Sequence, residues 1–284
     1  MKIVAPSQAM QQWSRQVAQQ HVLVPTMGAL HEGHAALIRR AREIADPSAT
    51  VVVSIFVNPI QFGVNEDLSC YPRTLAADVA LCEKENVDFL FYPTVEEMYA
   101  ADASVRISET QLSQRLCGAS RPGHFSGMAT VVAKLFNIVA PNIAIFGEKD
   151  WQQLAIIRRF VHDLNFPIEI IGHPTVREKD GLAMSSRNAY LTPEKRAVAP
   201  KIYQALQAVA AARATGEKNI AILLMAARMA LEDIPGAMID YIEIMNEETL
   251  APLSEISENS KPRLFVAVKL GETRLIDNIA LHAS

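Results

Sequence analysis

Short apolar runs alternate with amphipathic segments along the first 174 positions of the chain. Five of the runs are rich in β-branched or aromatic residues, as strands buried on both faces tend to be, and they cover 21–26, 50–57, 87–92, 142–146 and 167–172. Helical spacing of apolar residues covers 7–20, 33–45, 74–86, 126–140 and 150–164. This alternation predicts an α/β fold in which a parallel sheet has helices on both faces.

The pattern changes after about residue 174. Residues 193–233 are rich in alanine and helical in pattern, with a break near Thr215 and Gly216. Three β-like runs follow, and the last two are joined as a hairpin through GET; the runs cover 238–245, 263–270 and 274–281. Helices followed by antiparallel strands predict a separate, smaller α+β domain. We therefore divide the chain into residues 1–174 and 175–284.

The composition is that of an ordinary globular protein of 284 residues, half of them hydrophobic and 20% charged. The net charge is −4 and no run is rich in Lys or Arg, which argues against nucleic acid as a partner. Neither a signal-peptide core nor an apolar stretch of membrane-spanning length is present. Three cysteines without a C-x-x-C pair favour a reducing compartment. We therefore expect a cytoplasmic enzyme that acts on small molecules, away from membranes.

Residues 25–34 read PTMGALHEGH and follow the first predicted strand. Gly28 suits a tight turn there, and the helix that comes next directs its free N–H groups toward the same edge of the sheet, as in anion-binding sites. His31 and His34 are three positions apart and can share a face of that helix, and Gly33 lets a ligand approach the backbone. Together these features favour a nucleotide triphosphate, with both imidazoles donating hydrogen bonds to phosphate oxygens.

Polar side chains also follow the second and fourth predicted strands. In SIFVNPIQFG, Gln61 lies just beyond the strand end, where an amide can hold a carboxylate or hydroxyl without adding charge. In FGEKDWQQL, Lys149 can offset phosphate charge and Asp150 can accept from ribose hydroxyls, with Gln153 one turn later. Read alone, each of these also fits a structural role as a turn cap or an exposed charge pair.

Two further loops carry candidate side chains. In DGLAMSSRNAYLT, Arg187 can hold phosphate oxygens bidentately, with Ser185 and Ser186 as additional donors. A loop of this kind can close over a nucleotide and exclude water, although it could also be a solvated linker. In GASRPGHFSGM, Arg121 and His124 flank a strong turn signal, which is either a structural turn or a substrate-side loop.

The H-x-G-H motif together with the Ser-Arg loop resembles the nucleotidylyltransferase superfamily. Six ordered segments resemble one of its families more closely, the pantothenate synthetase (pantoate–β-alanine ligase) family: PTMGALHEGH, VSIFVNPIQF, EDLSCYPRTL, ASRPGHFSGM, FGEKDWQQL and DGLAMSSRNAYLT. RLIDN near the C-terminus also fits, so the resemblance covers essentially the whole chain. It implies a Rossmann-like domain that binds ATP and pantoate (1–174), a C-terminal lid domain (175–284) and a homodimer.

The resemblance also implies a reaction and its residues. (R)-Pantoate and β-alanine are joined with ATP and Mg²⁺ through an enzyme-bound pantoyl adenylate, and the Mg²⁺ ligands are left open. His34 matches the family's proton donor, His31 its partner and Lys149 the third catalytic group, while Gln61 and Gln153 match the substrate ligands. The ATP-binding residues implied are Met27, Gly28, Ala29, Leu30, His31, Glu32, Gly33, His34, Gly147, Glu148, Lys149, Asp150, Val176, Met184, Ser185, Ser186 and Arg187.

Three other interpretations compete with this one. The histidine pair could form part of a zinc site, for which His124 is the obvious third ligand. A plain nucleotidylyltransferase would release an adenylylated product and stop. An adenine-nucleotide sensor would bind ATP in the same crevice without releasing pyrophosphate. The paired glutamines and the long C-terminal segment favour the ligase over the plain nucleotidylyltransferase.

Overall fold

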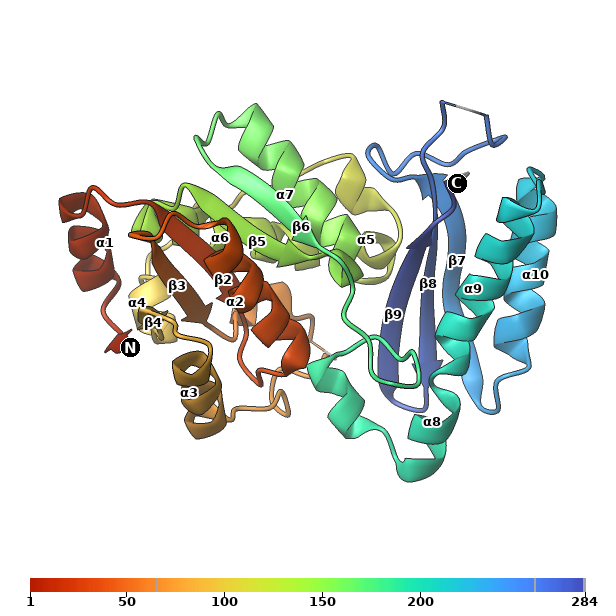
Figure 1. Ribbon diagram of the computed structural model, residues 1–284, viewed down its shortest axis with the longest axis horizontal. Helices are drawn as coiled ribbons and strands as arrows, with labels where there is room; N and C mark the ends of the chain where they lie inside the picture. The colour runs from red at the N-terminus through yellow and green to blue at the C-terminus, as the bar shows by residue number, and fades with distance from the viewer. Residues whose placement is uncertain (65, 258, 283–284) are drawn as a thin grey trace.

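The computed structural model of the chain describes residues 1–64, 66–257 and 259–282. In these ranges the strands form one sheet of six and one of three, with helices around both (Figure 1). The six-stranded sheet consists of β1 (Lys2–Val4), β2 (His21–Thr26), β3 (Thr50–Ile55), β4 (Phe89–Phe91), β5 (Ile143–Gly147) and β6 (Glu169–His173). The helices between its strands are α1 (Ser7–Gln16), α2 (Glu32–Ile44), α3 (Leu75–Lys84), α4 (Val95–Met98), α5 (Cys117–Ser120), α6 (His124–Val139) and α7 (Trp151–Asp163).

Every pairing in the six-stranded sheet is parallel, and the strand order is β1-β4-β3-β2-β5-β6. The chain adds β3 and β4 on one side of β2, and then β5 and β6 on the other. The direction of winding therefore reverses between β2 and β5. In open α/β sheets, ligands bind outside the carboxyl ends of the strands at such a reversal. The segment after β2 carries the histidine pair, and the short 3₁₀ turn η3 (Glu148–Asp150) after β5 carries Lys149.

Both faces of this sheet are covered, as its almost wholly apolar strands predict. Val22 and Val24 of β2 are buried against α2 and α3, in a cluster that includes Ile38. Leu23 points to the other face and belongs to a cluster with residues of α1, α6 and α7, such as Phe136. Strand residues therefore alternate between two apolar layers, which confirms the predicted α/β architecture.

The structure adds one strand to the five that the pattern predicts. β1 lies at the edge of the sheet, pairs with β4 over three residues and leaves Ile3 half exposed. A strand this short at an edge needs no apolar run of its own, so no run marked it. The other boundaries differ from the prediction by a few residues: the first helix ends at Gln16 rather than 20, and β4 is confined to Phe89–Phe91.

The C-terminal part is the α+β arrangement that the pattern predicts. It contains α8 (Pro193–Val198), α9 (Lys201–Ala214), α10 (Ile220–Glu232), β7 (Ala237–Asn246), β8 (Pro262–Leu270) and β9 (Thr273–Ala280). The three strands form an antiparallel meander, and α9 and α10 pack beside it (Figure 1). The predicted helix break is real, since Gly216 adopts φ +109° between α9 and α10.

The two faces of this small sheet pack against different neighbours. Leu264, Val266 and Val268 of β8 belong to a core with α9 and α10. Phe265, on the opposite face, belongs to the core of the first sheet, together with Met245 of β7. The C-terminal sheet therefore packs directly against the α/β unit and can hold parts of its site. No helix within the described residues has the length and apolarity needed to cross a membrane.

Candidate active site

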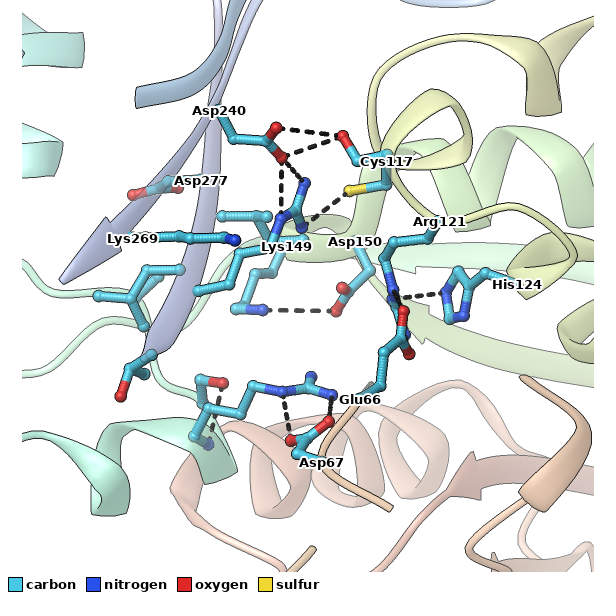
Figure 2. Close-up of a pocket in the computed structure, with 18 of the residues that line it drawn as sticks. Glu66, Asp67, Cys117, Arg121, His124, Lys149, Asp150, Asp240, Lys269 and Asp277 are labelled. Carbon is cyan, nitrogen blue, oxygen red and sulfur yellow. Dashed lines mark hydrogen bonds and ion pairs between the residues drawn. The ribbon is translucent and has the colours of Figure 1, made fainter. Parts of the chain in front are cut away.

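Two adjoining cavities open at the carboxyl ends of β2, β3, β5 and β6. The inner cavity, of about 240 Å³, is lined by both motif histidines, Gln61, Lys149 and the loop up to Arg187. The outer cavity, of about 1140 Å³, separates this edge from β7, β8 and β9. Figure 2 shows Lys149 and Asp150 in this space, facing Lys269 and Asp277 of the C-terminal sheet. The structure thus brings the motifs together at the winding reversal.

The histidine pair is held by the start of α2. His31 is the N-cap residue, and its Nδ1 accepts a hydrogen bond from the Gly33 N–H at 3.1 Å. Nδ1 of His34 in turn accepts from the His31 N–H at 3.2 Å. The ring centroids are 4.1 Å apart. Because each Nδ1 is an acceptor, the proton of a neutral ring lies on Nε2, so each imidazole has one N–H left for a ligand.

Both imidazoles are neutral at pH 7. Burial, assisted by the charge of Lys149, lowers the pKa of His31 to about 4. Burial, with the neighbouring His31 and Lys149, lowers the pKa of His34 to about 3. The rings therefore act as uncharged hydrogen-bond donors, and the fixed positive charge beside them is the Lys149 ammonium. A triphosphate brought into contact with them would raise both pKa values, because a nearby negative charge favours the protonated form.

The segment that precedes His31 is fastened by a carboxylate that the sequence patterns did not single out. Asp78 of α3 is buried, and it accepts from the N–H groups of Ala29 at 3.0 Å and Leu30 at 2.8 Å. The Thr74 hydroxyl completes its contacts at 3.0 Å. The one available signal was an aspartate within the apolar half of a predicted helix. Asp78 thus fixes the loop on the side away from the cavity.

Not every residue that the resemblance implies for ATP lines the cavity. Ala29 and Leu30 give their amides to Asp78, and the Glu32 carboxylate pairs with Arg39. The implied residues that line it are Met27, His31, Gly33, His34, Gly147, Lys149, Asp150, Val176, Met184, Ser185, Ser186 and Arg187. Gly28, Ala29, Leu30, Glu32 and Glu148 lie outside both sets of lining residues. Lining a cavity does not by itself show contact with ATP, so ATP contact stays a prediction for all seventeen residues.

The serine–arginine loop contacts the histidine segment. The Ser186 hydroxyl donates to the Ala29 carbonyl at 3.1 Å, which joins two segments 157 positions apart. Ser185 is the N-cap of the 3₁₀ turn η4 (Ser186–Tyr190), since its hydroxyl accepts from the Arg187 N–H at 3.3 Å. The loop therefore forms one wall of the inner cavity rather than a solvated linker.

The Arg187 guanidinium is already engaged, which the sequence does not predict. Its Nε and Nη2 donate to the two carboxylate oxygens of Asp67 at 2.9 and 3.0 Å. Arg121 is held in the same manner by Glu66, with contacts of 2.7 and 2.5 Å (Figure 2). The carboxylates of two successive residues thus form ion pairs with two arginines at the rim of the cavity. A phosphate group must displace Asp67 to be held through Nε and Nη2, whereas Nη1 and the second N–H of Nη2 form another pair that can hold it.

Gln61 presents an amide of fixed orientation. Nδ2 of the buried Asn58 donates to the Gly127 carbonyl at 3.1 Å and to Oε1 of Gln61 at 2.9 Å. The Tyr99 hydroxyl donates to Oδ1 of Asn58 at 2.8 Å. A backbone carbonyl only accepts, so Gly127 sets the orientation of Asn58, which sets that of Gln61. Nε2 of Gln61 donates one hydrogen to the sulfur of Met27 at 3.2 Å, and its second hydrogen is left for a ligand.

His124 is a wall residue. Its Nδ1 contacts the Gln61 carbonyl at 2.8 Å, and its Nε2 contacts Nη1 of Arg121 at 3.0 Å. Both ring nitrogens therefore have protein partners. Among the described residues, no group of three or more His, Cys, Asp or Glu side chains could hold a metal ion. The zinc interpretation finds no ligand set here.

The inner cavity joins this polar edge to an apolar wall. Side chains from β2, α2, α6 and β5, together with Phe56 directly after β3, form the wall: Pro25, Leu37, Phe56, Met128, Val131, Val132, Leu135 and Phe146. Gln61, Gln153, Lys149 and the two imidazoles line the same cavity. A cavity with both kinds of surface can hold a small, partly apolar anion together with a phosphate group.

Comparison with known sequences gives consistent matches along the chain. A family model described as Pantoate-beta-alanine ligase matches residues 2–280. Pantothenate synthetase of Pseudomonas putida is 54% identical over 261 residues, which are 91% of this chain and 89% of that protein. Pantothenate synthetase of Akkermansia muciniphila is 53% identical over 261 residues, which are 92% of each chain.

Solved structures are similar over nearly the same extent. A crystal structure of pantothenate synthetase from Thermus thermophilus superposes with a TM-score of 0.92 at 47% identity, covering 99% of this chain and 100% of that one. A pantoate–β-alanine ligase from Francisella tularensis, complexed with β-γ ATP and β-alanine, gives a TM-score of 0.80 at 35% identity, covering 99% and 98%. These similarities extend through both sheets.

Proposed function

The chain belongs to the pantoate–β-alanine ligase family, and we propose that its cleft first activates pantoate as an adenylate and then transfers the pantoyl group to β-alanine. It condenses (R)-pantoate with β-alanine to form pantothenate, and ATP is converted to AMP and pyrophosphate. One observation carries the assignment of roles. The inner cavity is lined together by the Gln61 donor, an apolar wall, two imidazole donors and Lys149.

In the first step a carboxylate oxygen of pantoate forms a bond to the α-phosphorus of ATP, and the bond to pyrophosphate breaks. Pantoate is already ionised at pH 7, so this step needs no general base. The obstacle is electrostatic, because an anion approaches a polyanion and charge builds up on the phosphate oxygens. Preorganised donors lower that barrier. The Nε2–H groups of His31 and His34 and the ammonium of Lys149 supply them.

The neutral state of the imidazoles suits this role. A buried neutral donor stabilises developing phosphate charge without requiring a counter-ion in the free site. As charge builds up on the phosphate oxygens, the Nε2–H of His34 can donate a stronger hydrogen bond to them. Transfer of a proton to pyrophosphate requires the imidazolium, so the proton-donor role that the resemblance implies is proposed for a ring that has first taken a proton at Nδ1 in place of the hydrogen bond from the His31 N–H.

Pantoate fits the remaining surface. Its carboxylate and hydroxyls accept hydrogen bonds, which the outward Nε2 of Gln61 can donate. Its two geminal methyl groups need an apolar surface, which Val131, Val132 and Leu135 offer. In the second step the neutral amine of β-alanine bonds to the acyl carbon of the adenylate, and the bond to AMP breaks while the amine loses a proton. Gln61 and Gln153 are the proposed ligands of the substrates.

Mg²⁺ is proposed as the companion of ATP. This ion is usually held by one or two carboxylates together with substrate phosphates and water, rather than by an all-protein cage. The cleft agrees with that habit, because the described residues form no acidic cage, and Asp150 lines both cavities with about half of its side chain exposed. We expect Asp150 to contribute to holding the ion, which would offset triphosphate charge.

The domain division, assembly and location are further proposals. We propose that residues 175–284 act as a lid on residues 1–174, because the outer cavity lies between the two sheets. A homodimer follows from the family resemblance alone. Free thiols at Cys70, Cys82 and Cys117 support a reducing compartment such as the cytoplasm.

The assignment is tested by incubating the protein with ATP, Mg²⁺ and pantoate, with and without β-alanine, and identifying every product. We expect pantothenate, AMP and pyrophosphate in equal amounts when β-alanine is present. Without β-alanine we expect pyrophosphate release limited to about one equivalent of enzyme, with adenylate retained. Continuous release of an adenylylated acid would identify a plain nucleotidylyltransferase, and ATP binding without pyrophosphate would identify a sensor.

A further inference from the structure

Asn278, the last residue of the RLIDN motif, belongs to the C-terminal sheet but contacts the turn that carries Lys149. It lies on β9 and is 5% exposed. Its Nδ2 donates to two successive carbonyls of η3, those of Glu148 and Lys149, each at 3.0 Å. Neither η3 nor the start of α7 has a side-chain cap of its own. The side-chain amide of Asn278 therefore stabilises this turn by hydrogen bonds that come from outside the α/β unit.

The orientation of that amide is fixed by its other neighbour. Nη1 of Arg263, on β8, donates to Oδ1 of Asn278 at 2.7 Å. A guanidinium can only donate and a carbonyl can only accept, so rotating the amide by half a turn would spoil three contacts. The two donors of Asn278 must therefore face η3.

Arg263 is itself held in place on both sides. Its Nε and Nη2 contact one oxygen of Glu247 at 3.1 and 2.9 Å. Its guanidinium stacks on the ring of Trp151, 3.4 Å from the ring centroid. Trp151 is the first residue of α7, directly after η3, and its Nε1 donates to the Glu247 carbonyl at 2.7 Å. The C-terminal part thus contacts the chain at η3, through Asn278, and at Trp151, through Arg263 and Glu247.

We propose that Asn278 is a positioning residue for Lys149. The proposal rests on the function proposed above, in which the Lys149 ammonium stabilises phosphate charge. The ammonium is carried on a flexible stem, so its reach depends on where the backbone of the turn is anchored. Displacement of a catalytic group by about 1 Å can cost about a hundredfold in rate. Asn278 fixes the backbone of the turn. Through this contact the C-terminal sheet affects the rate of the adenylation step.

The informative substitution is Asn278→Asp. A carboxylate keeps an acceptor for Arg263 but replaces both donors with an oxygen that repels the Glu148 and Lys149 carbonyls. We expect pantoate-dependent exchange of pyrophosphate into ATP to slow by about tenfold to a hundredfold. The pantoate KM should change less than about twofold, because Gln61 and the apolar wall are untouched. Asn278→Ala, which removes the donors without adding charge, is the second variant should Asn278→Asp fold poorly.

A double-mutant cycle separates positioning of Lys149 from general support of the fold. Both Asn278 variants are measured again in a Lys149→Ala background, where positioning has nothing to act on. Ser120→Ala is the matched control, because it removes another contact between the α/β unit and the C-terminal sheet, the Ser120–Asp240 hydrogen bond at 3.0 Å. Unfolding temperatures of all variants are recorded alongside.

Positioning predicts that the Asn278 substitutions slow exchange at least about tenfold with Lys149 present and less than about twofold without it. Equal losses in both backgrounds, or no loss in either, would overturn the proposal. If Lys149→Ala alone exchanges at the wild-type rate, the role of Lys149 fails and the Asn278 proposal falls with it. A wild-type protein that forms no pantothenate refutes the proposed function instead, so the two failures are distinct.

Discussion

At the scale of single residues, the amide of Gln61 illustrates how a neighbour determines the chemistry of a side chain. Asn58 occupies its oxygen, so the group that faces the cavity is a donor. A glutamine in solution is both donor and acceptor, but this one offers a donor to the ligand. That preference fits a substrate whose polar groups are a carboxylate and hydroxyl oxygens.

Gln61→Glu should therefore weaken the binding of pantoate more than the binding of ATP. One carboxylate oxygen still accepts from Asn58, while the other replaces the donor and repels the pantoate carboxylate. We expect the pantoate KM to rise about tenfold to a hundredfold, the scale of a lost charged hydrogen bond, with the ATP KM changed less than about twofold. Steady-state kinetics measures both, and Gln204→Glu on the exposed side of α9 is a control. An unchanged pantoate KM contradicts the assignment.

The ion pair between Arg187 and Asp67 gives a second prediction at this scale. Asp67 occupies two N–H groups of Arg187 and places a negative charge beside the ligand site. Asp67→Asn leaves a neutral partner that satisfies one of them, so ATP should bind about threefold more tightly, in line with the loss of a modest ion pair. Calorimetric titration with an ATP analogue measures the affinity. Glu66→Gln, which frees Arg121 instead, is the matched comparison, and weaker binding to Asp67→Asn would show that Asp67 itself helps to hold the ligand.

At the scale of elements, the start of α2 depends on a glycine for a reason beyond access of a ligand. A Cβ at Gly33 would lie 2.8 Å from Cε1 and 2.9 Å from Nδ1 of His31. The ring could not then fold back onto the Gly33 N–H. The same orientation of the His31 ring therefore caps the helix and directs the imidazole N–H toward the ligand.

Gly33→Ala should remove the helix cap and the orientation of the His31 ring together. The His31 ring must swing away, so we expect kcat/KM for ATP to fall about a hundredfold, as for loss of a preorganised donor, with about 1 kcal/mol of stability lost with the cap. Gly63→Ala serves as the control, since its added Cβ would meet Glu66 at ordinary distances of 3.6–3.7 Å. Kinetics and urea unfolding measure the two effects. Wild-type activity in Gly33→Ala would mean that the ring need not cap the helix.

At the scale of the whole molecule, the buried histidines link folding to pH. The pKa values of His31, His34 and His124 are lowered by burial, to about 4, 3 and 4. The unfolded chain binds protons at these positions near pH 6.5, whereas the folded protein does so only near pH 3–4. Between those limits the unfolded state holds more protons, so stability falls as the pH falls.

We therefore expect the unfolding temperature to decrease steadily from pH 7 to pH 5 for the histidine-linked part of stability. Thermal unfolding at several pH values measures this slope. His124→Gln should make the slope shallower by the contribution of one proton. A slope that is identical in the wild-type protein and in His124→Gln would show that His124 is not held neutral by the fold.

Much of this molecule could be predicted from short stretches of sequence. The alternation of β-branched runs with helical spacing predicted the α/β sheet, because strand and helix periods are local properties of the chain. The C-terminal hairpin was predicted for the same reason. β1 was missed because three residues at an edge leave no pattern. Asp78 was missed because an aspartate among apolar residues of a helix does not show which backbone groups, 48 and 49 positions away, it will bind.

The sequence by itself determined which chemical groups gather at the carboxyl ends of the strands, since residue types and their order after each strand are written in it. Only the tertiary structure decided the state of those groups. The charge of the imidazoles depends on burial. The engagement of Arg187 by Asp67 and of the Lys149 turn by Asn278 joins positions 120 and 129 residues apart. Donor orientation and pKa depend on atoms within a few ångströms in space, and distance along the chain says little about which atoms those are.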